Sequence, residues 1–254
     1  MGDTVTMFSV EYRQQVSSRV LVWAESDQRV VAGASIGSLA HGPGDRWSDL
    51  DLTFAVADDA KTADVLEDWA GKLAAEFDAI RLFDLPSGRS IYRVFLLPGC
   101  LQFDLSFSPA SDFGAIGPQF KLLFGVAVEK PHIAPPSAPD LFGYAVHHAL
   151  RARLCIERNR HCQAEYWISA SRDYALSLAC LRRGLPAHHG RGFDDLPTEL
   201  QDLLNEALVT SLQKDALVRA LGRAIELLLR ESAEILDVPA RIKSELRHLS
   251  AASI

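Results

Sequence analysis

The distribution of hydrophobic and polar residues changes about halfway along the chain. Up to residue 112, stretches with apolar residues at helical spacing are interspersed with short apolar or alternating stretches that are typical of strands. From residue 140 onward only the helical spacing is present. The pattern therefore predicts an α+β first half followed by an all-α helical bundle.

The elements predicted by this pattern follow one another without repeats. In the first half the predicted helices are 8–28 and 62–76, with a short helix opening at 38–41, and the predicted strands are 29–36, 49–56, 80–85, 90–97 and 101–107. In the second half the predicted helices are about 140–160, 163–183, 198–213, 215–235 and 239–250.

Prolines cluster where the two patterns meet. Residues 125–140 contain Pro131, Pro135, Pro136 and Pro139, a composition typical of a linker or a domain edge. We therefore expect an N-terminal domain over residues 1–125, a proline-rich linker over 126–139 and a helical domain over 140–254.

Charge is distributed unevenly between the two halves. The chain has 26 Lys and Arg against 33 Asp and Glu, a net charge of −7. Residues 1–135 carry 11 Lys and Arg against 18 Asp and Glu, whereas residues 136–254 carry 15 of each. Within the second half, residues 140–191 hold eight Arg and four acidic residues. The acidic balance disfavours a nonspecific DNA-binding protein.

The sequence predicts neither membrane insertion nor secretion. No uninterrupted apolar run approaches roughly 18 residues, and the first residues lack a basic segment followed by an apolar one. We expect a cytoplasmic protein. The four cysteines, Cys100, Cys155, Cys162 and Cys180, form no C-x-x-C pair, so we expect buried, reduced thiols.

Two aspartates stand on one face of a predicted strand. In the segment 49–56, Asp49 and Asp51 are two residues apart and point to the same side, while the alternate residues Leu50 and Leu52 face the core. Adjacent carboxylates repel one another unless a cation lies between them, and their hard oxygen atoms suit Mg²⁺.

A third aspartate, Asp104, lies at the centre of the strictly alternating segment 101–107. If this strand is a neighbour of 49–56, Asp104 joins the pair, and three carboxylates can hold two divalent ions about 3.5–4 Å apart. Asp84 and Asp112 are acidic residues of the same region in poorer strand contexts.

A glycine and a serine end the first predicted strand. Gly37 lets the backbone approach a phosphate closely, and the hydroxyl of Ser38 and the N–H groups of the following turn can donate hydrogen bonds to it.

Gly37-Ser38, followed after ten residues by Asp49-Leu50-Asp51 and later by Asp104, resembles the signature of the nucleotidyltransferase superfamily typified by DNA polymerase beta. The resemblance covers about residues 29–107. It implies a mixed sheet flanked by helices in the N-terminal domain. In size and layout the chain resembles the aminoglycoside and lincosamide nucleotidyltransferases, in which a helical domain binds the acceptor.

The resemblance also implies a reaction. A nucleoside monophosphate passes from a nucleoside triphosphate, ATP being the expected one, to a hydroxyl of a small molecule such as an antibiotic, and pyrophosphate is released. Two Mg²⁺ ions are the implied cofactors, with Asp49 and Asp51 bridging both. Asp104 then holds the catalytic ion and helps to remove the proton of the hydroxyl.

Further residues are weaker candidates for binding. For the triphosphate we select His41, Arg46 and Arg172, although an ion pair of Arg172 with Glu165 or Asp173 is the competing interpretation. Trp47 and Glu165 are candidates for the acceptor, with packing as the alternative for Trp47 and a role as base for Glu165.

Two other functions are compatible with the sequence. The same chemistry on a protein side chain or an RNA end, as in antitoxin-like members, is one, although the acidic front half weighs against RNA. A non-catalytic nucleotide-binding module is the other, and the complete set of three acids disfavours it. A monomer and a homodimer are both compatible with the sequence.

Overall fold

The chain divides into two structural units, with the boundary in the sequence between residues 133 and 134. A computed structural model describes residues 7–132 and 134–250. Over these residues it contains seven α-helices and a six-stranded mixed sheet, so the α+β class predicted from the sequence is confirmed. Each unit has its own hydrophobic core.

The first unit is built around the sheet. Its elements are α1 Val10–Ser26, β1 Val30–Ile36, β2 Leu50–Val56, α2 Thr62–Phe77, β3 Ile80–Ser87, β4 Ser90–Leu97, β5 Leu101–Pro109 and β6 Phe120–Phe124, with short 3-10 turns at Gly37–Leu39, Pro98–Cys100 and Ala110–Asp112. The strand order is β3-β4-β5-β2-β1-β6. Only β2 and β5 run parallel, and the other neighbouring pairs are antiparallel.

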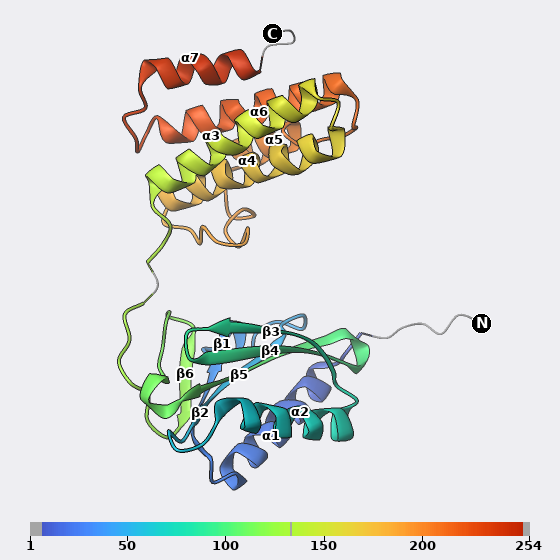
Figure 1. Cartoon of the computed structure of the whole chain (residues 1–254), viewed down its shortest axis with the longest axis vertical. Coiled ribbons are helices and arrows are strands. Elements are labelled where there is room, and N and C mark those ends of the chain that lie inside the picture. The colour runs from blue at the N-terminus through green and yellow to red at the C-terminus, as the bar shows by residue number, and fades with distance from the viewer. Residues whose placement is uncertain (1–6, 133, 251–254) are drawn as a thin grey trace, which may run out of the picture. The chain divides into compact units, whose positions relative to one another are not determined.

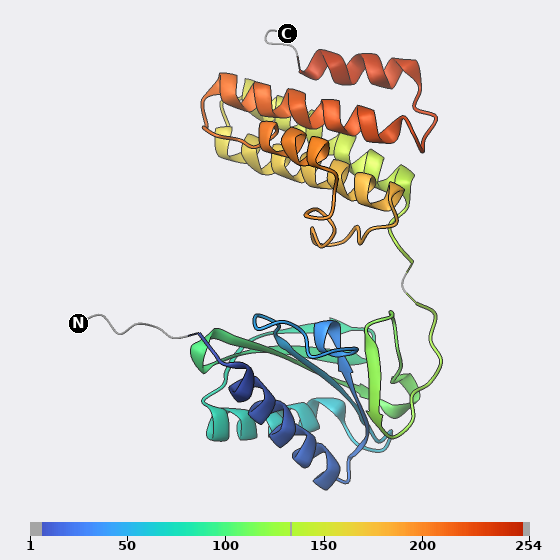
Figure 2. The same ribbon diagram turned by 180° about the vertical axis from the view of Figure 1, so that it is seen from behind.

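Helices α1 and α2 cover the same face of the sheet (Figures 1 and 2). Helix α2 places Leu66, Trp69 and Leu73 on one side, and all three are buried. They pack with Leu52 and Phe54, which alternate along β2 toward the helices. The residues between them on β2 therefore face the side of the sheet opposite to α1 and α2.

Strand β6 is an element that the sequence did not predict. It is a five-residue edge strand that pairs with β1, and its residues are exposed or half-buried, so it lacks the alternation that identified the other strands. The chain then returns to the unit, because Val128 N donates to Phe113 O at 2.7 Å and Lys130 pairs with Asp112 at 2.9 Å. The first residues of the predicted linker thus pack on the first unit.

The regular elements described over residues 134–250 of the second unit are helices. They are α3 Ala138–Glu157, α4 His161–Arg182, α5 Thr198–Glu206, α6 Lys214–Ser232 and α7 Ala240–Leu249. Helices α3, α4 and α6 pack lengthwise against one another (Figure 1). None of the helices described in the chain combines the length and the apolar character that a membrane span requires.

The predicted helix over residues 198–213 is too long. Helix α5 ends at Glu206, and residues 207–213 form a connection in which Leu208 and Leu212 are exposed. The side chain of Ser211 accepts a hydrogen bond from Gln213 N at 3.2 Å, a local bond that competes with the helical one.

The expectation of buried thiols holds for only two of the cysteines. Cys155 and Cys180 are buried in the helical core, whereas Cys100 and Cys162 are exposed, and all four are free. Cys100 has a φ of 60°, in the tight turn between β4 and β5 that keeps its side chain out of the core.

Candidate metal and nucleotide site

Two aspartates face each other on the parallel strands of the sheet. Asp51 on β2 is the register partner of Asp104 on β5. Their neighbours Leu50, Leu52 and Phe103 are buried on the helical side, so the two carboxylates project from the other side. The parallel pairing fulfils the condition under which Asp104 was expected to join Asp51.

Asp49 completes a cluster of three half-buried carboxylates. One oxygen atom each from Asp49, Asp51 and Asp104 can be chosen such that all lie within 4.8 Å of one another. Asp49 precedes the first residue of β2, so it belongs to the end of a loop and not to the strand as predicted. Three carboxylates at these distances form a donor set of the kind that hard divalent cations take.

Negative charges within the cluster disfavour the ionised form of Asp104 when no cation is bound. Burial raises the pKa of Asp104; the hydrogen bond donated by Gln102 Nε2 at 3.0 Å opposes this rise, and the charge of Asp49 adds to it. A negative neighbour raises a carboxyl pKa because it disfavours the ionised form. A divalent cation would reverse this effect, so the residues present fit such an ion.

Gly37 lies directly against the cluster. Its φ is +67°, in the region that glycine adopts readily, and a Cβ atom at this position would collide with Asp51 Oδ2. The backbone of the turn at Gly37–Leu39 therefore passes close beside a carboxylate of the cluster. Ser38 follows within the same turn and is exposed, so the Gly-Ser pair lies next to the three aspartates.

The described contacts of the remaining candidates in the first unit are with residues other than the three aspartates. His41 Nε2 forms a hydrogen bond with Pro118 O at 2.8 Å. The guanidinium of Arg46 lies over the ring of Trp47, 4.4 Å from its centroid, and also donates to Phe8 O at 3.3 Å. Trp47 is 62% exposed, so its ring does not belong to the hydrophobic core.

The other acids considered from the sequence have different partners. Asp84 accepts from Arg93 Nε at 2.7 Å on the helical side of the sheet, and the Arg93 guanidinium lowers the pKa of Asp84. Asp112 pairs with Lys130. Both carboxylates are thus neutralised by side chains, in contrast to the like-charged cluster at Asp104.

Arg172 and Glu165 both belong to α4 in the helical unit. Arg172 pairs with Asp173 at 2.8 Å, which is one of the competing interpretations drawn from the sequence. Glu165 accepts a hydrogen bond from Ser169 Oγ at 2.8 Å. The helical unit thus provides local partners for both residues, and their roles toward a nucleotide or an acceptor stay predictions.

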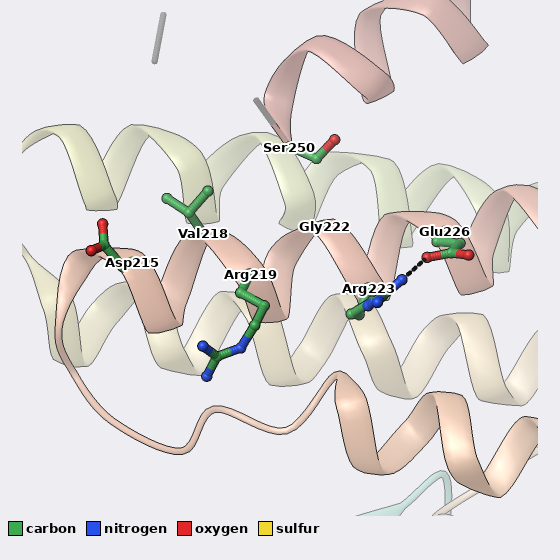
Figure 3. Close-up of a pocket in the computed structure, with 7 residues that line it drawn as sticks. All are labelled: Asp215, Val218, Arg219, Gly222, Arg223, Glu226 and Ser250. Atoms are coloured by element: carbon green, nitrogen blue, oxygen red, sulfur yellow. Dashed lines mark hydrogen bonds and ion pairs between the residues drawn. The ribbon is translucent and has the colours of Figure 1, made fainter. Parts of the chain in front are cut away.

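A cavity of about 530 Å³ lies in the helical unit along α6 (Figure 3). Arg219 and Arg223 line it together with Asp215 and Glu226. Arg223 is already paired, with Glu206 at 2.9 Å and with Glu226 at 2.7 Å. The residues that line this cavity carry charges of both signs, and some of these charges are already paired. They do not form a set of converging ligands as the three aspartates do.

Two residues with a place at the site were missed from the sequence. Gln102 stands two residues before Asp104 on β5, and this i, i+2 spacing could have identified it as a neighbour on the same face. Arg13 on α1 donates hydrogen bonds to the loop before Asp49. Nothing in the local sequence distinguishes Arg13 from a solvent-exposed arginine of an amphipathic helix.

Comparisons with known proteins find similarity among solved structures. No protein-family profile and no curated protein sequence matches the chain. Among solved structures, an aminoglycoside 6-adenyltransferase from Bacillus subtilis is similar at a TM-score of 0.42 and 14% sequence identity, over 93% of this chain and 97% of that one. Similarity at this level does not assign a family, and the function is therefore argued from the residues of the site.

Proposed function

We propose that the chain is a Mg²⁺-dependent nucleotidyltransferase that moves a nucleoside monophosphate from a nucleoside triphosphate to a hydroxyl of a small molecule. The observation that carries this proposal is the cluster of Asp49, Asp51 and Asp104 beside the turn of Gly37 and Ser38. The same residues in the same order resemble the signature of the superfamily typified by DNA polymerase beta.

In this proposal the three aspartates hold the divalent ions. When bound, Mg²⁺ would offset the negative charge of the triphosphate and of the leaving pyrophosphate. Asp49, Asp51 and Asp104 supply carboxylate oxygens, which are the ligands that Mg²⁺ prefers in proteins.

The remaining steps belong to the residues of the chain. The Ser38 hydroxyl and the N–H groups of its turn donate to the phosphates, and Gly37 keeps the space between the turn and Asp51 free of a side chain. Asp104, whose pKa is raised by burial, accepts the proton of the acceptor hydroxyl. The hydroxyl oxygen then bonds to the α-phosphorus as the bond to the pyrophosphate oxygen breaks.

The resemblance also guides the choice of acceptor. We propose residues 1–125 as the catalytic part and the helical part, residues 140–254, as the part that binds the acceptor. Aminoglycosides and lincosamides are the first acceptors to test, with ATP as the first nucleotide. His41, Arg46 and Arg172 are proposed phosphate contacts, and Trp47 and Glu165 are proposed acceptor contacts.

The test is release of pyrophosphate by the full chain. The protein is mixed with Mg²⁺, one of the four common ribonucleoside triphosphates and a panel of aminoglycosides and lincosamides, and the product is identified by its added mass. We expect release that requires both an acceptor and Mg²⁺ and that stops on addition of EDTA.

A matched pair of variants distinguishes transfer at the proposed site from transfer by a contaminating enzyme. Asp51→Asn removes one carboxylate of the cluster, and Asp59→Asn removes the same charge from an exposed loop position. Transfer that survives Asp51→Asn contradicts the proposed site. Labelling of protein or RNA in a lysate, without transfer to any small acceptor, would favour the macromolecular alternative.

A further inference from the structure

A single buried arginine connects α1 to the loop before Asp49. Arg13 is 3% exposed, and its guanidinium donates to three backbone carbonyl oxygens. Nη1 lies 2.5 Å from Ser48 O and 2.9 Å from Asp45 O, and Nη2 lies 3.3 Å from Pro43 O. A buried charge is costly unless its donors are satisfied, so the bonds that hold Arg13 in place hold the loop as well.

The chemistry of the loop explains why an arginine occupies this position. The loop has no ladder bonds of its own, and Gly44, at φ +61°, turns the chain sharply. Asp45 Oδ1 braces the loop internally by accepting from Trp47 N at 2.8 Å and from Ser48 Oγ at 3.0 Å. Several carbonyl oxygens then point at one place, which suits the planar fork of a guanidinium better than the point charge of a lysine.

Of the three clustered aspartates, Asp49 is the one that the sheet does not hold. The ladder between β2 and β5 begins with Leu50 and includes the pair Asp51 and Asp104. Two carboxylates are therefore positioned by strand pairing. The backbone of Asp49 lies outside that ladder, at the end of the loop that Arg13 anchors.

The bond between Arg13 and Ser48 O acts directly on Asp49. The carbonyl of Ser48 and the N–H of Asp49 belong to the same planar peptide unit. A fixed Ser48 carbonyl therefore fixes the peptide plane that precedes Asp49. Only the torsion angles of Asp49 itself then remain free.

We infer that Arg13 is a positioning residue that sets the orientation of Asp49 relative to Asp51 and Asp104. The inference rests on the proposed function, because it concerns the same metal site. Arg13 would touch neither the nucleotide nor the metal, and it would act through the backbone of the loop.

The test measures divalent-ion binding without turnover. Mn²⁺ is titrated into the full-length protein, and free Mn²⁺ is followed by electron paramagnetic resonance. Circular dichroism records the folded fraction of each variant. We expect Arg13→Gln to weaken Mn²⁺ binding about tenfold, within the range seen when residues that support metal ligands are replaced. Arg13→Lys keeps the charge but loses the fork, and we expect an intermediate affinity.

Arg19→Gln is the matched control on the same helix. Arg19 is exposed and pairs with Glu76 at 2.6 Å, on the surface. We expect this variant to bind Mn²⁺ as the unmodified protein does. Asp51→Asn is the second control, and it should lose most of the binding.

A second measurement reports on the loop itself. Trypsin can cut after Arg46, and the anchored loop should resist this cut. We expect faster appearance of fragment 1–46 for Arg13→Gln than for Arg19→Gln, measured by mass spectrometry under native conditions. If Arg13→Gln does not fold, Arg13→Lys is used for both measurements.

The possible results separate this inference from the proposed function. If Asp51→Asn loses Mn²⁺ while the Arg13 variants retain full affinity, Arg13 has no positioning role, even where the loop is cut faster. If the unmodified protein does not bind Mn²⁺, or Asp51→Asn binds it equally well, the proposed metal site is wrong and this inference falls with it.

Discussion

Asp51 and Asp104 lie directly opposite one another on the parallel strands β2 and β5. They are the most rigidly placed pair of like charges in the candidate site, since both backbones belong to the sheet. A bound ligand has to offset the repulsion between these two carboxylates, because strand pairing keeps their backbones from moving apart. This relationship leads to the first prediction.

Asp51→Asn and Asp104→Asn should each lower the rate of nucleotidyl transfer about 100-fold or more, a loss typical of removing one electrostatic contact to a transition state. Each substitution removes a cation ligand without changing the size of the side chain. The measurement is kcat at saturating nucleotide. Equal rates for Asp104→Asn and the exposed control Asp59→Asn would remove Asp104 from the mechanism.

Gly37→Ala should impair the site while leaving the sheet folded. The added methyl group would collide with Asp51 Oδ2, and alanine at φ +67° costs about 1–2 kcal/mol. We expect a lower melting temperature together with a loss of Mn²⁺ affinity. Gly117→Ala is the control, because its Cβ would enter open space. Similar Mn²⁺ binding by the two variants would show that the close approach at Gly37 has no function.

Arg172→Gln should raise the KM for the nucleotide about tenfold if Arg172 contacts phosphate, since a charged hydrogen bond contributes about 1.5–3 kcal/mol. Asp173→Asn is the discriminating partner. It breaks the 2.8 Å ion pair but leaves the guanidinium in place. A purely structural pair predicts the same effect for both variants, whereas a phosphate contact predicts a raised KM for Arg172→Gln alone.

Asp27→Asn should destabilise the first unit by about 2 kcal/mol. Asp27 accepts from Arg29 Nη2 at 2.8 Å and Arg29 Nε at 2.9 Å, and from Trp69 Nε1 at 2.9 Å. Asparagine keeps an acceptor for Trp69 but loses the charge that binds Arg29, and hydrogen bonds to charged groups contribute about 1.5–3 kcal/mol. The free energy of unfolding in urea measures the loss. Asp68→Asn, at an exposed partner of the same arginine, should cost much less.

The same aspartate predicts a dependence of stability on pH. The hydrogen bonds from Arg29 hold the pKa of Asp27 far below its ordinary value in the folded state. As the pH falls below about 4, the unfolded chain takes up a proton there before the folded chain does, so stability is lost toward acid. The difference in unfolding free energy between the unmodified protein and Asp27→Asn should therefore shrink as the pH falls below 4. A difference that does not change with pH would contradict this assignment.

Much of the first unit could be predicted from the sequence because its patterns are local. Leu50, Leu52 and Phe54 alternate along β2 as predicted, and Asp51 between them was placed on the opposite face. The pairing of β2 with β5 was not predicted from the sequence; it was only the condition under which Asp104 would join Asp49 and Asp51. Which strands become neighbours depends on the packing of the whole sheet, not on either segment alone.

Strand β6 and Arg13 were missed because they depend on distant contacts. Strand β6 is defined by its bonds to β1, about 85 residues earlier in the chain, and its own sequence shows no alternation. Arg13 is identified only by carbonyl groups about 30 residues away. The sequence does not distinguish a buried arginine from one on the surface, because the difference arises only from the fold.

The parallel pairing of β2 with β5 has a consequence for the order of events during folding. The intervening segment forms α2, β3 and β4, and β5 is inserted between β4 and β2. A contact over such a separation forms late, because a long stretch of chain must first be brought into place. A chain still leaving the ribosome before β5 has emerged lacks Asp104, the third carboxylate of the proposed site. Divalent-ion binding at the proposed site would thus begin only once β5 has paired with β2 in the sheet.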